Sequence, residues 1–164
     1  MRTVAVYPGS FDPPTFGHLD IIDRSSRVFS RVIVAVATNI RKNAMFTTRE
    51  RLDMLRRLTG GFANVEVDTF GGLLVEYAQA KGAHVLVRGL RAISDFEYEF
   101  QMAHMNRKLD SDVDTVFMMT GERYSYISSN IVKEIARFGG RIDDLVPPLV
   151  RGKVLEKIKA KKRS

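Results

Sequence analysis

Five short segments of the chain are rich in apolar, β-branched residues. They are residues 3–7, 31–38, 65–69, 84–87 and 115–119. Short apolar runs of this kind are typical of strands buried in a parallel sheet. Between them, apolar residues recur at three- and four-residue spacing, as they do along one face of a helix. The pattern therefore predicts strands and helices in alternation.

Local signals mark several helix ends. Thr47 with Glu50, and Ser94 with Glu97, match the capping box in which each side chain satisfies a free backbone N–H group. Gly82 is placed to end the third helix. After the turn-forming stretch 143–148, a last helix is predicted by apolar positions at Val150, Val154, Leu155 and Ile158.

This order of elements predicts a single Rossmann-like α/β domain. Right-handed crossovers between parallel strands place helices on both faces, so we expect a five-stranded parallel sheet covered on both sides. A length of 164 residues with 45% hydrophobic content leaves little room for a second core. We assign residues 1–150 to the α/β domain and residues 151–164 to a basic C-terminal helix that belongs to the same domain.

Composition excludes several classes of protein. The longest aliphatic run, residues 32–37, is far shorter than the roughly 20 residues that span a bilayer, and the N-terminus lacks the apolar core of a signal peptide. The chain has no cysteine, so disulfides, thiolate nucleophiles and cysteine-based metal sites are excluded. We therefore expect a cytoplasmic protein without a membrane association.

The net charge of +7 comes almost entirely from one segment. Residues 151–164 carry +6, and the remainder carries only +1. A basic run can bind nucleic acid or an anionic surface, but a solvated helix end is the simpler interpretation. Nucleic acid is therefore not an expected partner, and we expect the basic residues from Lys157 onward to be dispensable for chemistry.

Several familiar motifs are absent. The sequence contains no G-x-G-x-x-G, no P-loop and no G-x-S-x-G. The alternation of Asp110, Asp112 and Asp114 lacks the glycine and glutamate of a calcium loop, and the three histidines lack zinc-site spacing. No metal site made by the protein alone is expected.

The loop after the first strand has the composition of a phosphate cradle. Residues 7–18 read Tyr-Pro-Gly-Ser-Phe-Asp-Pro-Pro-Thr-Phe-Gly-His. The prolines and Gly9 are expected to fix a turn, Ser10 and Thr15 offer hydroxyls, and Gly17 with His18 opens a helix whose N-terminal N–H groups attract anions. A rigid loop with a capping histidine is the structural alternative.

The other predicted strands are also followed by polar residues. Ligands of open parallel sheets bind beyond the carboxyl ends of the strands, so these groups should meet in one place. Individually, Arg88 and Arg91 could pair with Asp95 or Glu99, and residues 128–130 could merely cap a helix. Jointly they predict a polyphosphate site. The groups are Asn39, Arg41 and Lys42, then residues 71–74, 88–91 and 121–129.

These motifs resemble a known family. Residues 15–18, Thr-Phe-Gly-His, resemble the (H/T)-x-G-H signature of the nucleotidyltransferase superfamily, and residues 127–129 resemble its second signature. Together with segments 7–13, 87–92, 95–99 and 102–107, they make residues 1–150 similar to bacterial phosphopantetheine adenylyltransferases. The chain departs from the family pattern at Ser10, commonly Thr, at Asn130, usually Ser, and at Phe16, often polar.

The resemblance implies transfer of the adenylyl group of ATP to the 4′-phosphate of phosphopantetheine, giving dephospho-coenzyme A and pyrophosphate. It implies that His18 stabilises the transition state with Lys42 and Arg91, and that Mg²⁺ is bound with ATP. Ser10, Lys42, Leu74 and Arg88 would bind the acceptor. The residues implied for ATP are Ser10, Phe11, Gly17, His18, Gly89, Arg91, Glu99, Tyr124, Ile127, Ser128, Ser129 and Asn130.

The resemblance also implies a homo-oligomer, typically a hexamer, and coenzyme A as a candidate inhibitor. Two alternatives stay open at this point. Nicotinate mononucleotide adenylyltransferases and cytidylyltransferases share the signatures but use other substrates. A non-catalytic binder of nucleic acid or anionic surfaces would use the basic C-terminal residues, and its affinity would fall steeply with salt.

Overall fold

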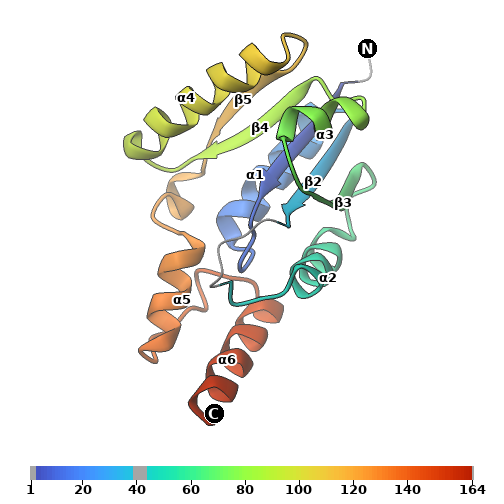
Figure 1. The fold of residues 1–164 in the computed structure, drawn as a ribbon. Coiled ribbons are helices and arrows are strands. Elements are labelled where there is room, and N and C mark those ends of the chain that lie inside the picture. Colours follow the sequence, from blue (N-terminus) through green and yellow to red (C-terminus); the bar gives the residue numbers. More distant parts are fainter. Residues whose placement is uncertain (1–2, 39–43, 164) are drawn as a thin grey trace.

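The five expected strands form one parallel sheet in the computed structural model, which describes residues 3–38 and 44–163 (Figure 1). The strand order is β3-β2-β1-β4-β5. This arrangement confirms the Rossmann-like α/β prediction. The strands are β1 (Val4–Gly9), β2 (Arg31–Ala37), β3 (Val65–Phe70), β4 (Val85–Leu90) and β5 (Asp114–Met119).

β1 and β4 continue beyond the apolar runs that predicted them. Pro8 and Gly9 were expected in a turn, but they lie within β1, opposite Ala35 and Val36 of β2. Arg88 was expected after a strand and instead belongs to β4. A strand predicted from apolar residues alone ends at the first proline, glycine or arginine. The actual strand continues as long as its neighbour supplies backbone hydrogen bonds.

Three of the predicted helix-end signals can be compared with the structure. Thr47 caps α2 reciprocally with Glu50, and Gly82, with φ of +64°, follows the end of α3, so both predictions are confirmed. The box at Ser94 is wrong, because Ala92 is the N-cap of α4 and Ser94 lies inside the helix. The α-helices are α1 (Phe16–Val28), α2 (Thr48–Thr59), α3 (Leu74–Ala80), α4 (Ile93–Leu109), α5 (Ser129–Arg137) and α6 (Pro148–Arg163), and a 3-10 turn covers Glu122–Tyr124.

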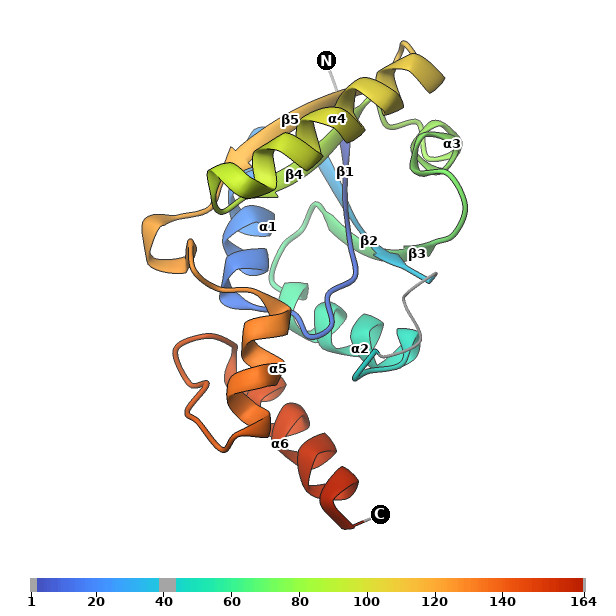
Figure 2. The same ribbon diagram turned by 60° about the vertical axis from the view of Figure 1, so that its left-hand side comes forward.

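Helices cover both faces of the sheet, as expected (Figures 1 and 2). On one face, Ile22 of α1 and Leu55 of α2 join the buried cluster formed by β1 and β2. On the other face, Val75 and Ala78 of α3 pack against Ile33 and its neighbours. α4 covers β4 and β5 on this second face, where Phe96 contacts Phe117 edge to face.

A third apolar cluster joins α2, α5 and α6, which lie beyond the carboxyl ends of the strands (Figure 1). Val150 and Val154 of α6 are buried in it, which confirms the predicted apolar face of the last helix. Lys157 also belongs to this packing, since its ammonium lies 2.8 Å from Glu50 and 5.6 Å from the centre of the Phe46 ring. No helix among the described residues is long and apolar enough to cross a membrane.

Candidate active site

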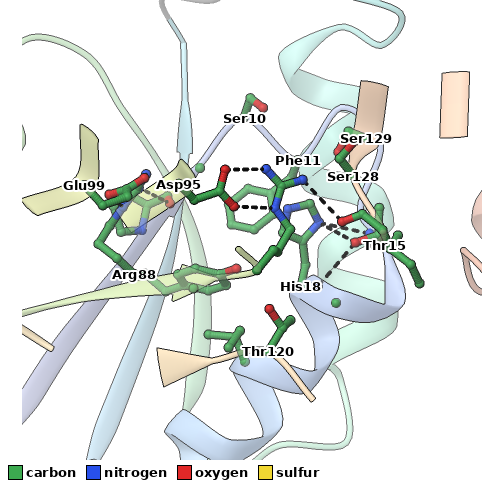
Figure 3. A pocket seen from close by; sticks show the side chains of 18 of the residues that line it. Ser10, Phe11, Thr15, His18, Arg88, Asp95, Glu99, Thr120, Ser128 and Ser129 are labelled. Carbon is green, nitrogen blue, oxygen red and sulfur yellow. Dashed lines mark hydrogen bonds and ion pairs between the residues drawn. The ribbon is translucent and has the colours of Figure 1, made fainter. Parts of the chain in front are cut away.

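A cavity of about 530 Å³ opens at the carboxyl ends of β1 and β4 (Figure 3). The pairing between these two strands covers Ala5 and Val6, and beyond it the strands separate. The connections of β1 and β4 run to opposite sides of the sheet, so the cavity lies at the topological switch point where such sheets bind ligands.

Most of the residues expected in the site line this cavity. They are Ser10, Phe11, Gly17, His18, Arg88, Gly89, Arg91, Glu99, Ile127, Ser128, Ser129 and Asn130. Two others do not: Leu74 packs beside the cluster under α3, and Tyr124 lies next to Gly17 and stacks on Phe16. The expected residue Lys42 lies outside the described residues.

The lining also contains residues that were not singled out as ligand contacts. Thr15 was expected in the phosphate cradle, and Asp95 and Tyr98 stand within segment 95–99, whereas Thr120 carries no local signal. Burial raises the pKa of the Tyr7 phenol above its ordinary value, so this hydroxyl stays protonated near neutral pH. The residues are Tyr7, Pro8, Gly9, Thr15, Ile21, Asp95, Tyr98 and Thr120.

The loop between β1 and α1 is held rigidly on its outer side. The buried carboxylate of Asp12 accepts hydrogen bonds from the backbone N–H groups of Met45 and Phe46, at 2.9 and 2.8 Å. It also accepts one from the ammonium of Lys133, at 3.0 Å. Because these donors come from the segment before α2 and from α5, Asp12 joins three parts of the chain around the cavity.

His18 caps its own helix and is thereby fixed in one tautomer. Its Nδ1 accepts a hydrogen bond from the backbone N–H of Thr15 at 3.0 Å, while the hydroxyl of Thr15 accepts from the backbone N–H of His18 at 3.3 Å (Figure 3). An accepting Nδ1 leaves the proton on Nε2. Burial, with smaller effects from Arg91 and Arg88, lowers the pKa of His18 to about 4. The imidazole is therefore a neutral N–H donor at the cavity.

Both cavity arginines form paired hydrogen bonds with carboxylates of α4 (Figure 3). Arg88 binds Glu99 through Nε and Nη2, at 2.7 and 2.5 Å, and its Nη1 donates to the carbonyl of Pro8 at 3.0 Å. Burial would lower the pKa of Arg88, but its bonds to Glu99 outweigh burial and raise it. Both ions are mostly buried, so Arg88 is a permanent cation in this wall.

Arg91 binds the other carboxylate. Its Nε and Nη2 donate to Asp95 at 2.9 and 3.2 Å, and its Nη1 donates to the carbonyl of Ile127 at 3.3 Å. Arg91 therefore links the start of α4 to the segment that precedes α5. From the sequence, either arginine could pair with either carboxylate. In the structure Arg88 pairs with Glu99, and Arg91 pairs with Asp95.

Two helix N-termini reach the cavity from different sides. Gly17 and His18 belong to the first turn of α1, and Ser129 and Asn130 to the first turn of α5. Ser128 caps α5 by accepting from the backbone N–H of Ile131, so its expected capping role is present. Free N–H groups and the helix dipole make such ends favourable for anions.

Together these groups suit polyphosphate binding better than covalent catalysis. The cavity offers two arginines, a neutral imidazole N–H and two helix N-termini. Within the described residues there is no group of three metal-ligating side chains. Such a site can orient anions and stabilise charge that develops on a phosphoryl group during attack by a second substrate.

Fold and site define an α/β protein of the nucleotide-binding class, and comparison with known proteins agrees. The model of the cytidylyltransferase-like family matches residues 6–135. Two solved adenylyltransferase structures share the fold, with TM-scores of 0.69 and 0.68 at 19% and 13% identity. The first is a nicotinate-nucleotide adenylyltransferase assigned in Vibrio parahaemolyticus, and the match covers 94% of this chain and 99% of that one. The second is the Plasmodium falciparum nicotinic acid mononucleotide adenylyltransferase complexed with NaAD, and the match covers 98% of this chain and 96% of that one.

Relatives of much higher identity are named phosphopantetheine adenylyltransferase. The protein of that name from Geobacter sulfurreducens is 59% identical over 154 residues, which cover 94% of each chain. The one from Alkaliphilus metalliredigens is 55% identical over 147 residues, covering 90% of this chain and 94% of its own. The chain belongs to the phosphopantetheine adenylyltransferase family, within the cytidylyltransferase-like proteins.

Proposed function

We propose that this protein transfers the adenylyl group of ATP to the 4′-phosphate of phosphopantetheine, giving dephospho-coenzyme A and pyrophosphate. The observation that carries the proposal is the neutral Nε2–H of His18 in a cavity walled by two arginines. A phosphate is already a competent nucleophile, so the reaction needs no general base and no covalent intermediate. What it needs is orientation of two polyanions and stabilisation of charge at the α-phosphoryl group.

The candidate site residues divide between the two substrates. His18 donates a hydrogen bond to the α-phosphate as its charge grows, and Arg91 contacts the phosphates of ATP. Arg88 and Ser10, with Lys42, hold the acceptor phosphate, and Leu74 lies along the pantetheine arm. Phe11, Gly17, Gly89 and Glu99 bind the nucleotide together with residues 124–130. A side chain at position 89 would crowd Ile21, because a Cβ there would lie 3.2 Å from its Cγ1.

Magnesium fits this site as part of the nucleotide. The nearby carboxylates of Asp95 and Glu99 are engaged by arginines. Mg²⁺ binds through few protein carboxylates and several phosphate oxygens. When bound with ATP it would neutralise charge on the phosphates that leave as pyrophosphate.

Pyrophosphate release tests the proposal directly. We expect it when ATP and phosphopantetheine are supplied together, and not with either alone. Release with nicotinate mononucleotide in place of phosphopantetheine would instead favour the other adenylyltransferases that share this fold. Salt-sensitive binding to DNA or heparin, without pyrophosphate release, would favour the non-catalytic alternative.

We also propose a cytoplasmic homo-oligomer, a hexamer by family resemblance, that coenzyme A can inhibit. The support for assembly is a row of exposed apolar residues on α4, described below. Coenzyme A is the dephospho product with one more phosphate, so the cavity that releases the product can bind it. Inhibition by coenzyme A competitive with phosphopantetheine would support this assignment.

A further inference from the structure

A buried arginine lies beneath the phosphate loop, outside the lining of the cavity. Arg51, on α2, is only 2% exposed. Among the described residues it forms no ion pair, and its Nε has no hydrogen-bond partner. Burial lowers the pKa of Arg51, and a nearby carboxylate, Asp12, offsets part of that effect. Burying an unpaired cation is costly, so a purely structural role in the core would be better filled by an apolar side chain.

The hydrogen bonds of Arg51 explain its position. Nη1 donates to the carbonyl of Ser10 at 2.7 Å and to the carbonyl of Ala37 at 3.1 Å. Nη2 donates to the hydroxyl of Thr48 at 3.0 Å. Ser10 directly follows β1, and Ala37 ends β2. One planar guanidinium therefore fixes the backbone where both strands reach the site.

The bond to Ser10 also sets the direction of the next amide. The carbonyl of Ser10 and the N–H of Phe11 belong to one peptide unit, which is trans, so they point in opposite directions. Arg51 holds the carbonyl on the side away from the cavity. The N–H of Phe11 must then point to the cavity side, where both Ser10 and Phe11 are lining residues. No described group accepts a hydrogen bond from this N–H.

The backbone conformation of Phe11 needs support of the kind that the Arg51–Ser10 hydrogen bond gives. Phe11 has φ of +49°, in the left-handed region that side-chain-bearing residues avoid. Its ring is fully buried between Tyr7 and His18, with ring centres 5.5 and 4.9 Å away. The ring and the Ser10 carbonyl are thus both anchored, and the N–H between them has a fixed direction.

We propose that Arg51 is a positioning residue that turns the backbone N–H of Phe11 into the cavity as a donor to a phosphate of the bound nucleotide. This inference rests on the proposed function. A donor fixed before binding costs nothing to orient when the anion arrives. The positive charge of Arg51, never exposed to the ligand, adds to the favourable potential for the same anion.

The test separates the phosphate from the nucleoside. Inorganic pyrophosphate and adenosine are titrated separately by calorimetry into the wild type, Arg51→Lys and Arg51→Met, and kcat is measured on each. Arg51→Lys keeps the positive charge but lacks the planar guanidinium that holds the carbonyl of Ser10. The direction of the Phe11 N–H is then no longer fixed. We expect about tenfold weaker pyrophosphate binding, of the size of one lost hydrogen bond to a charged group. Adenosine binding should change less than about twofold.

Two control variants lie on the same helix. Arg57→Met removes an exposed arginine and should change neither probe. Thr59→Ala removes a buried hydroxyl that donates to the carbonyl of Leu55, so it should lower the melting temperature without changing either affinity. It shows what destabilisation of α2 alone does, and Arg51→Lys covers the case in which Arg51→Met fails to fold.

Unchanged pyrophosphate affinity in Arg51→Lys would overturn the proposal, and so would equal weakening of pyrophosphate and adenosine. A wild type that binds no pyrophosphate would overturn it as well. Failure of the proposed function has a different signature. In that case the wild type binds both probes, the Arg51 variants separate them, and no pyrophosphate is released from ATP with phosphopantetheine.

Discussion

At the scale of single residues, His18 combines two tasks through its two ring nitrogens. The backbone N–H of Thr15 occupies Nδ1, which fixes the ring plane and leaves Nε2–H for the substrate. The capping histidine that we considered as a structural alternative is therefore present, and it is compatible with catalysis. The cap orients the donor.

We predict that His18→Ala lowers kcat by about 10²- to 10³-fold, the usual effect of losing one transition-state donor. The KM for ATP should change little, because the bond strengthens chiefly as charge develops. His84→Ala is the matched control, since His84 is exposed, directly precedes β4 and is not among the residues that line the cavity. Steady-state kinetics on both variants test this, and near-normal turnover in His18→Ala would remove His18 from its role.

The lowered pKa of His18 also predicts how stability varies with pH. In the unfolded chain His18 takes up a proton near pH 6.5, whereas the folded group does so only near pH 4. The unfolded state binds more protons between these values, so stability falls as pH decreases from about 6.5 to 4. The full loss is on the order of 3 kcal/mol.

Thermal unfolding of the wild type and His18→Gln across this range measures that contribution. The melting temperature of the wild type should fall more steeply toward pH 4, because glutamine does not titrate. Activity should show no titration of this group between about pH 5.5 and 8. Parallel pH profiles of stability for the two proteins would contradict the assignment of a neutral buried imidazole.

Sequence reasoning found the chemistry of most site residues but not their pairing. Glu99 and Asp95 are one helical turn apart, so both stood within reach of both arginines, and only the three-dimensional positions of β4 and α4 decide between them. Thr120 was missed because a single threonine outside a motif gives no signal. Tyr98 stands within segment 95–99, but the segment alone does not tell which of its side chains reaches the cavity. Arg51 was missed because a lone arginine in an amphipathic helix is ordinarily a surface residue.

At the scale of elements, Asp12 is the point that joins the loop after β1 to the segment before α2 and to α5. Both Asp12 and Lys133 are largely removed from water, with side-chain exposures of 4% and 14%. Removing one partner of such a pair leaves the other charge buried and uncompensated, which typically costs about 3–5 kcal/mol.

We therefore predict that Lys133→Met lowers the free energy of unfolding by several kcal/mol, measured by urea denaturation. Arg31→Met, which breaks the exposed pair with Glu66, should cost less than about 1 kcal/mol. The double variant Asp12→Asn with Lys133→Met should recover part of the loss, because no charge is then left unpaired. Equal small effects of Lys133→Met and Arg31→Met would show that the Asp12 contact does not hold these elements together.

Element boundaries illustrate what a local pattern can and cannot determine. Five apolar runs were enough to locate every strand of the sheet. Their ends depended on backbone pairing with a neighbour, which carried β1 through Pro8 and Gly9. The pair Ser94 and Glu97 likewise predicted the wrong start for α4, which begins at Ile93. The same motif at Thr47 and Glu50 predicted the start of α2 correctly.

At the scale of the whole molecule, α4 leaves an uncovered apolar face, although β4 and β5 lie beneath it. The sheet ends at β5 on this side, and Met119 of that strand is also exposed. The helix contributes Tyr98, Met102, Met105 and Leu109, which are exposed and share one side of the helix by their spacing. Phe96 and Phe100 are exposed on the other side, where Phe96 contacts Phe117. A row of exposed apolar residues of this kind marks an interaction site. A second copy of the chain fits the assembly proposed above, because a face of this composition would be buried between like subunits.

The last prediction concerns that face. Met105 and Leu109 are 52% and 53% exposed and one helical turn apart, so Met105→Lys with Leu109→Lys adds two charges without disturbing the core of the subunit. We expect the double variant to form a smaller species than the wild type in light scattering coupled to size-exclusion chromatography. Phe138→Lys is the control, since Phe138 is 87% exposed and follows α5 instead of lying on α4. If both variants keep the wild-type mass, α4 does not form the subunit interface. If the wild type is itself a monomer, the proposed assembly is wrong, and α4 must present its apolar residues to something other than a second copy of this chain.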